Sequence, residues 1–163
     1  MYRVRRGDVR RDRELILDLW SRSFGASMSR AAKFEAHYLA APLGEPLVQI
    51  MLAGEEPVGV VAAEPRALRQ GSRVLRAGLM MDFAVLPGHR TLGPALALQR
   101  ALLTDSAGRF DLLYGFPNEK AVPVFIRAGY SRLGPMVRHA RVLKPEGYLA
   151  RTLAPALAFV LST

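Results

Sequence analysis

The spacing of apolar residues changes repeatedly along this chain, and the order of the changes restricts the fold more than any other feature. Apolar side chains recur at helical spacing from Val9 to Gly25, with Ile16, Leu19 and Trp20 on one face. Asp8 is placed to cap this helix. A second helical stretch covers 31–40 and stops at Pro42 and Gly44. The spacing predicts two consecutive helices, with Trp20 in the core.

Short β-compatible runs make up most of the remaining chain. They cover 2–5, 47–53, 58–63, 74–86, 111–116, 130–133 and 137–143. Gly54 to Pro57 forms a hairpin turn between the second and third runs, and 66–73 reads as a polar stretch. Two further helices are expected at 92–108 and 118–129. The sum is a mixed α/β layer fold.

The chain length of 163 residues suits a single domain. We find no internal repeat and no linker long enough to divide it, so we predict one domain over 1–146. The remaining 147–163 form an apolar tail. An exposed apolar segment usually marks an interface. We expect this tail to pack on the domain or to form the contact of a homodimer.

Composition excludes several classes of protein. The absence of cysteine excludes disulfides, thiolate zinc sites and a cysteine nucleophile. His37, His89 and His139 lack ligand spacing, so no metal is expected. The chain shows neither a signal peptide nor the roughly 20 apolar residues of a membrane-spanning helix. The cytoplasm is the expected location.

The formal net charge of +9 comes mostly from arginine, with only three lysines among 23 basic residues. A nucleic-acid partner would call for a basic face with interleaved aromatics. Here the arginines are spread along the chain and aromatics make up 8%. No specific nucleic-acid partner is therefore expected, and an anionic ligand remains open.

A turn rich in small residues joins the strand at 74–86 to the helix that follows. Backbone amides at such a turn converge with the positive end of the helix dipole and hold anions such as phosphate. Gly93 and Ala95 let the backbone approach a ligand closely, and Arg90 supplies a cation. The alternative is a plain loop.

The same segment carries a motif, Val85-x-Pro87-x-x-Arg90-x-x-Gly93-x-Ala95. It resembles the Arg/Gln-x-x-Gly-x-Gly/Ala signature of the GNAT acyltransferase superfamily, whose element order also matches. A second segment, Asn118-x-x-Ala121-x-x-Val124-Phe125-x-x-x-Gly129-Tyr130, is similar to that family's Asn-x-x-Ala…Tyr-x-x-x-Gly-Phe. The resemblance covers residues 2–143. It implies the GNAT fold, a mixed and mostly antiparallel sheet of six or seven strands flanked by about four helices.

The resemblance further implies an N-acyltransferase that uses acetyl-CoA or another short acyl-CoA and no metal. An amine acceptor would attack the thioester directly in a ternary complex. The Val85 backbone would align the pantetheine arm, and the following turn would hold the pyrophosphate. The implied cofactor-binding residues are Val85, Gly88, Arg90, Thr91, Leu92, Gly93, Ala95, Asn118 and Phe125.

Two residues depart from the family pattern. Pro94 lies in the phosphate turn without an N–H, although it suits the first position of a helix. Phe125 stands where many relatives have the tyrosine that protonates the departing thiolate. Because of Phe125, the alternative function is that of a non-catalytic acyl-CoA-binding or regulatory domain.

Asp82 is the candidate general base, because family members often place a carboxylate on the fourth strand. The alternative is an ion pair with Arg76 or Arg90. Asn118 either caps its helix or bonds the pantetheine, or does both.

Other residues are weaker candidates. Arg127 reaches the CoA 3′-phosphate or lies on a solvated face. His37 and Tyr38 fall in the region that shapes the acceptor site in the family. The tetrapeptide Gly115-Phe116-Pro117-Asn118 resembles GNAT-like domains associated with bacterial cell-wall and exopolysaccharide acyltransferases.

Overall fold

The computed structural model describes residues 1–25 and 29–137. The chain divides into two units, Met1–Arg132 and Leu133–Thr163. Of the second unit only 133–137 are described, and these are exposed and neither helical nor in a strand. The predicted tail at 147–163 lies outside the described residues, so this tail and the boundary at 146 stay predictions.

The first unit is built on one mixed sheet whose spatial order follows the chain order. Its strands are β1 (Tyr2–Arg6), β2 (Leu47–Ala53), β3 (Glu56–Gln70), β4 (Arg73–Val85) and β5 (Leu112–Gly115). Neighbours from β1 to β4 are antiparallel, whereas β5 runs parallel to β4. The mixed, mostly antiparallel sheet expected from the sequence is therefore present.

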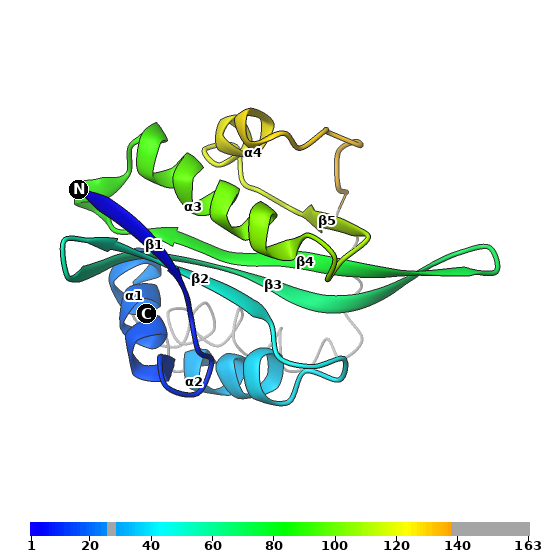
Figure 1. Ribbon diagram of the computed structural model, residues 1–163, viewed down its shortest axis with the longest axis horizontal. Coiled ribbons are helices and arrows are strands. Elements are labelled where there is room, and N and C mark those ends of the chain that lie inside the picture. The colour runs from blue at the N-terminus through cyan, green and yellow to red at the C-terminus, as the bar shows by residue number, and fades with distance from the viewer. Residues whose placement is uncertain (26–28, 138–163) are drawn as a thin grey trace, which may run out of the picture. The chain divides into compact units, whose positions relative to one another are not determined.

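Helices cover both faces of this sheet (Figure 1). One face carries α1 (Arg13–Phe24) and α2 (Ser29–Phe34), and α2 continues into a π-helical turn at Glu35–Leu39. The other face carries α3 (Leu92–Ser106) and α4 (Val122–Ala128). These are the four helices that the apolar spacing predicts.

Burial on both faces explains why β2 and the first half of β3 are apolar nearly throughout. On the first face they meet Ile16, Leu19 and Trp20 of α1, all at most 1% exposed, so the predicted core position of Trp20 is confirmed. Asp8 caps a turn before α1 instead of α1 itself, since its Oδ1 accepts hydrogen bonds from the amides of Arg10 and Arg11.

The hairpin of β3 and β4 is longer than the sequence pattern predicts. The polar stretch at 66–73 belongs to these strands and pairs as far as Gln70 with Arg73. Most side chains near this end are exposed, so no alternation of apolar and polar residues marks the strands. Backbone pairing alone extends the hairpin, which projects past the helices in Figure 1.

The expected strand at 130–133 is wrong. Gly129 adopts a left-handed conformation (φ 104°) at the end of α4, and the Tyr130 amide bonds back to the Phe125 carbonyl. Residues 131–137 are exposed and lie in no strand. The described residues thus form five strands, not six or seven. Apart from Val137, the strand expected at 137–143 lies outside them.

Two irregularities in β4 position the candidate site. Opposite Val61 the register with β3 shifts, which places a bulge at Asp82 and Phe83. Asp82 has φ 54°, a left-handed conformation that non-glycine residues adopt rarely. Pairing with β5 ends at Met80 and Gly115, and β4 continues to Val85 while the chain after Gly115 leaves toward α4. The two strands therefore part beside Pro117.

Candidate functional site

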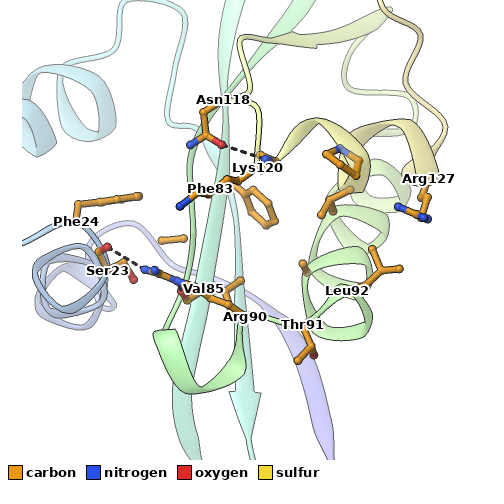
Figure 2. A pocket seen from close by; sticks show the side chains of 15 residues that line it. Ser23, Phe24, Phe83, Val85, Arg90, Thr91, Leu92, Asn118, Lys120 and Arg127 are labelled. Carbon is orange, nitrogen blue, oxygen red and sulfur yellow. Dashed lines mark hydrogen bonds between the residues drawn. The ribbon is translucent and has the colours of Figure 1, made fainter.

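A cavity of about 610 Å³ lies where β4 and β5 part, between the end of β4, the start of α3 and the segment that leads into α4. Figure 2 shows its lining side chains. It brings together six of the nine residues predicted to bind a cofactor: Val85, Arg90, Thr91, Leu92, Ala95 and Asn118.

The other three predicted residues do not line this cavity. Gly88 lies in the exposed 3₁₀ turn at Pro87–His89. Gly93 is exposed on the first turn of α3, and no atom lies within 4 Å of the position that a Cβ would take there. Phe125 faces a smaller adjoining cavity. Gly93 thus leaves the amino end of α3 open to approach.

The first turn of α3 supplies amide donors at the rim of the cavity. Thr91 occupies the N-cap position without a side-chain cap bond, so Leu92, Gly93 and Pro94 are the first three helical residues. Pro94 is third and not first, contrary to the sequence interpretation. It costs no helical hydrogen bond there, because the first amides of a helix have no partner inside it. Two amides and the helix dipole remain for an anion.

Arg90 lines the cavity and bridges two elements. Its Nε donates to the Val85 carbonyl at 2.7 Å, and its Nη2 donates to the Ser23 carbonyl at 3.0 Å. Figure 2 shows the side chain directed from the loop toward the end of α1. A guanidinium has five N–H donors. Three of them are therefore not used by these two bonds.

Sequence reasoning missed several lining residues, among them Ser23, Phe24 and Lys120. Lys120 follows Asn118 by two residues and lies inside the second motif, so the sequence could have predicted a cation there. Ser23 and Phe24 end α1 far away in sequence, and no pattern relates them to β4. The Ser23 hydroxyl is buried and finds no hydrogen-bond partner within residues 1–25 and 29–137. Arg127 is exposed and also lines the cavity.

Asn118 acts as a local cap. Its Oδ1 accepts a hydrogen bond from the Ala121 amide at 3.0 Å, and its carbonyl accepts from Ala121 and Val122. Asn118 thus caps the turn that precedes α4 and not α4 itself, whose N-cap position is Ala121, and the same side chain faces the cavity.

The smaller adjoining cavity, about 160 Å³, extends toward the bulge in β4. It shares Phe83, Asn118 and Ala121 with the larger one, and Asp82 and Phe125 line it. The Asp82 side chain is only 6% exposed. A nearly buried carboxylate therefore lies beside the point where the strands part.

The partners of Asp82 are neither Arg76 nor Arg90, contrary to the alternative drawn from the sequence. Its Oδ1 forms an ion pair with Lys33, and its Oδ2 accepts a hydrogen bond from the Tyr38 hydroxyl at 3.0 Å. The side chain meets α2 and the π-helical turn, whereas Arg76 pairs with Asp111 ahead of β5 at 2.9 Å.

Burial and the nearby Asp82 charge raise the pKa of Tyr38 well above its usual value. The phenol therefore stays protonated and donates to the carboxylate. It holds one oxygen of Asp82 in place.

Phe125 is buried, with its ring 6.0 Å from the Phe83 ring and 5.1 Å from the Tyr130 ring. The Tyr130 hydroxyl contacts the Met80 sulfur, and burial raises the pKa of Tyr130. Phe125 thus fills space at the parting of the strands and brings no proton donor.

His37 belongs to a second polar cluster under the same helices, built around the buried Glu64 carboxylate. Its Nδ1 lies 3.2 Å from an oxygen of Glu64, which is 1% exposed, and Arg66 donates to that oxygen at 2.7 Å. His37 and Tyr38 therefore contact two different carboxylates, one on β3 and one on β4.

Within the described part of the chain, no group of three or more acidic or histidine side chains is placed to hold a metal ion. No helix of that part is long and apolar enough to cross a membrane.

Several solved structures with this architecture are named as acetyltransferases or N-acyltransferases. A probable N-acyltransferase from Enterococcus faecalis V583 superposes with a TM-score of 0.68 at 21% identity; the match covers 80% of this chain and 32% of that one. A predicted acetyltransferase from Clostridium acetobutylicum, solved with acetyl-CoA, gives 0.68 at 15% identity over 86% of this chain and 96% of that one.

A GCN5-related N-acetyltransferase from Ralstonia eutropha JMP134 gives 0.65 at 20% identity, over 86% and 99% of the two chains. No family model matches the sequence, and no curated protein matches it. The likeness concerns the fold. This chain has the fold of the GNAT N-acetyltransferase superfamily, as its two motifs predict.

Proposed function

We propose that the protein is an acyl-CoA-dependent N-acyltransferase. It transfers an acetyl or other short acyl group from CoA to an amine by direct attack in a ternary complex. The observation that carries this proposal is the cavity at the parting of β4 and β5, which has the open first turn of α3 at its rim and a nearly buried carboxylate lining the adjoining cavity.

The lining of the cavity suits the chemistry of an acyl-CoA. The pyrophosphate binds the Leu92 and Gly93 amides and the remaining N–H groups of Arg90. Lys120 and Arg127 supply further positive charge along the wall. The phosphates of the ligand thus meet cations, and its amides meet backbone groups. Its aliphatic carbons meet apolar side chains, and its thioester reaches the interior of the cavity.

The pantetheine arm follows the edge of β4. Beyond Met80 this edge has no partner from β5, and an extended ligand can pair with it there, although the Val85 carbonyl already accepts a hydrogen bond from Arg90 Nε. The bulge at Asp82 turns the backbone here. Ser23 brings a buried hydroxyl without a partner in the described residues, which a polar ligand group satisfies.

Asp82 acts as the general base. Its carboxylate removes a proton from the acceptor ammonium, the neutral amine attacks the thioester carbonyl, and the carbon–sulfur bond breaks to release CoA. The Tyr38 hydroxyl holds the carboxylate in one orientation during this step. Positioned general bases accelerate such reactions by roughly 10²- to 10⁴-fold.

Phe125 is compatible with this chemistry. An alkyl thiol ionises near pH 8.5, so the departing thiolate is a fair leaving group at neutral pH, and it takes up, directly or through water, the proton that the attacking nitrogen loses as it becomes an amide. The absence of a hydroxyl at Phe125 does favour one second candidate, a domain that binds acyl-CoA without turnover.

One experiment separates these functions. Thermal unfolding is followed with acetyl-CoA and with acetyl-pantetheine, which lacks the nucleotide phosphates. At 100 times its Kd a ligand stabilises by about 2.7 kcal/mol, and acetyl-CoA should stabilise more strongly. Acetylated products are then sought by mass spectrometry in a panel of peptides, polyamines and amino sugars. Binding with product supports the transferase, binding without product supports the second candidate, and no binding refutes both.

A further inference from the structure

We propose that Asp82, Tyr38 and Trp20 form a binding site for an unbranched alkylammonium group, and that the Lys33 side chain occupies this site from within the chain. The Lys33 ammonium pairs with Asp82 Oδ1 and lies over the Trp20 ring, 5.0 Å from its centre. The Tyr38 hydroxyl bonds the other carboxylate oxygen.

The surroundings of Asp82 call for a cation at this point. A carboxylate that is 6% exposed is costly when unpaired, and a neutral phenol on one oxygen does not balance its charge. The face of an indole ring adds attraction for a cation, strongest where water is excluded. The carboxylate from β4 and the ring from α1 contact the ammonium, and the hydroxyl from the π-helical turn holds the carboxylate.

The aromatic wall fits the stem of an alkylamine. The Trp20 ring lies 5.3 Å from Tyr38 and 5.9 Å from Phe34, and Phe34 stacks on Tyr38 at 4.6 Å. All three rings are buried, so the wall is fixed by core packing. In the structure the Lys33 ammonium covers the Trp20 face, and an external alkylammonium takes the place that Lys33 vacates over this ring while its charged end reaches the carboxylate.

Lys33 itself is free to leave. Its side chain is 43% exposed and belongs to the six-residue helix α2, so rotation about its side-chain bonds releases the ammonium without unfolding the helix. The second buried carboxylate, Glu64, already has Arg66 and His37 as partners. The site that an external ammonium can enter is therefore the one at Asp82.

This site is the acceptor site if the proposed function holds, because Asp82 lines the cavity that adjoins the expected acyl-CoA cavity. The acceptor class is then an unbranched primary alkylamine, such as a lysine side chain or a polyamine. Lys33 competes with it from within the chain. A site filled nine-tenths of the time by an internal group lowers the apparent affinity of its ligand about tenfold.

The test is chemical rescue of Lys33→Ala without any acyl-CoA. Thermal unfolding is measured against n-butylammonium chloride, with n-butanol as the neutral control and ionic strength held constant. We expect Lys33→Ala to melt below the wild type and to regain stability saturably with n-butylammonium, at about tenfold lower concentration than any effect on the wild type. Lys120→Ala, which also removes one lysine, should show no such gain.

Asp82→Asn in the Lys33→Ala background should abolish the rescue. Asparagine tolerates the left-handed backbone of this position, and circular dichroism confirms folding. No rescue, equal rescue by n-butanol, or rescue that survives Asp82→Asn would overturn the proposal. Since no acyl-CoA is present, these outcomes are independent of whether the protein binds acetyl-CoA.

Discussion

Arg90 Nε donates a hydrogen bond to the carbonyl oxygen of Val85 at 2.7 Å, across the loop that joins β4 to α3. A second bond from the same guanidinium reaches the Ser23 carbonyl at the end of α1. Together these bonds fix the loop against the end of the strand. The residue that offers charge to a bound anion therefore also orients the helix start that receives it.

Replacement of Arg90 by alanine should weaken acetyl-CoA binding. A hydrogen bond to a charged group contributes about 1.5–3 kcal/mol, and about 1.4 kcal/mol corresponds to a factor of ten in Kd. We expect Kd to rise by roughly 10- to 100-fold in isothermal titration calorimetry. Arg69→Ala, which removes the same charge from an exposed position in β3, is the control. Equal Kd values for the two variants would remove Arg90 from the site.

Replacement of Gly93 by valine should weaken acetyl-CoA binding and leave folding unaffected. No atom lies near the position of the new Cβ, and the backbone there is not left-handed, so the free protein should melt within a few degrees of the wild type. The added side chain occupies the approach to the α3 amides, and acetyl-CoA binding should fall about tenfold or more. Gly88→Val, in the exposed 3₁₀ turn, tests the other predicted glycine. Unchanged affinity in Gly93→Val would show that no ligand approaches this turn closely.

Asp12 should contribute stability that depends on pH. Arg5 donates to both of its oxygens at 2.8 and 2.7 Å, and these bonds, followed by one from the Asp8 amide, hold the pKa of Asp12 below its usual range. A lowered pKa in the folded state stabilises the protein above the unfolded value of about 4, and the effect is lost as pH falls through the folded value.

Asp12→Asn should therefore cost about 1 kcal/mol at pH 7, a modest figure because solvent screens the pair. Urea unfolding at pH 7 and pH 3 should show the difference from the wild type shrinking at the lower pH. Asp18→Asn, at an exposed helix pair, is the control. A difference of the same size at both pH values would mean that the charge of Asp12 contributes nothing.

The sequence predicts those parts of the fold that depend on local signals. The four helices, the turn at Gly54 and the segment from Val85 to Ala95 all carry breakers or periodic apolar residues, and the structure has them there. The polar half of the β3–β4 hairpin has no such signal, because most of its side chains are exposed and the strands pair through backbone alone. The apolar residues Tyr130 and Leu133 suggest a strand, yet Gly129 directs the chain back onto α4.

The site was predictable only within the two sequence motifs. Val85, Arg90 and Asn118 lie within or beside motifs, and the structure brings them to one cavity. Lys33 and Tyr38 reach Asp82 only because α2 packs on the sheet across the bulge in β4, a tertiary contact between segments more than 40 residues apart. Ser23 likewise reaches the cavity only through a tertiary contact.

The most direct test of the account is the rate of thiol release from acetyl-CoA by the wild type and by Asp82→Asn, with the amine that the panel identifies as acceptor. The account predicts a fall in kcat of roughly 10²- to 10⁴-fold with an unchanged Kd for acetyl-CoA. Asparagine accepts the backbone conformation of Asp82, so the substitution removes the base and not the bulge. A kcat equal to that of the wild type would contradict the role of Asp82 and the mechanism built on it.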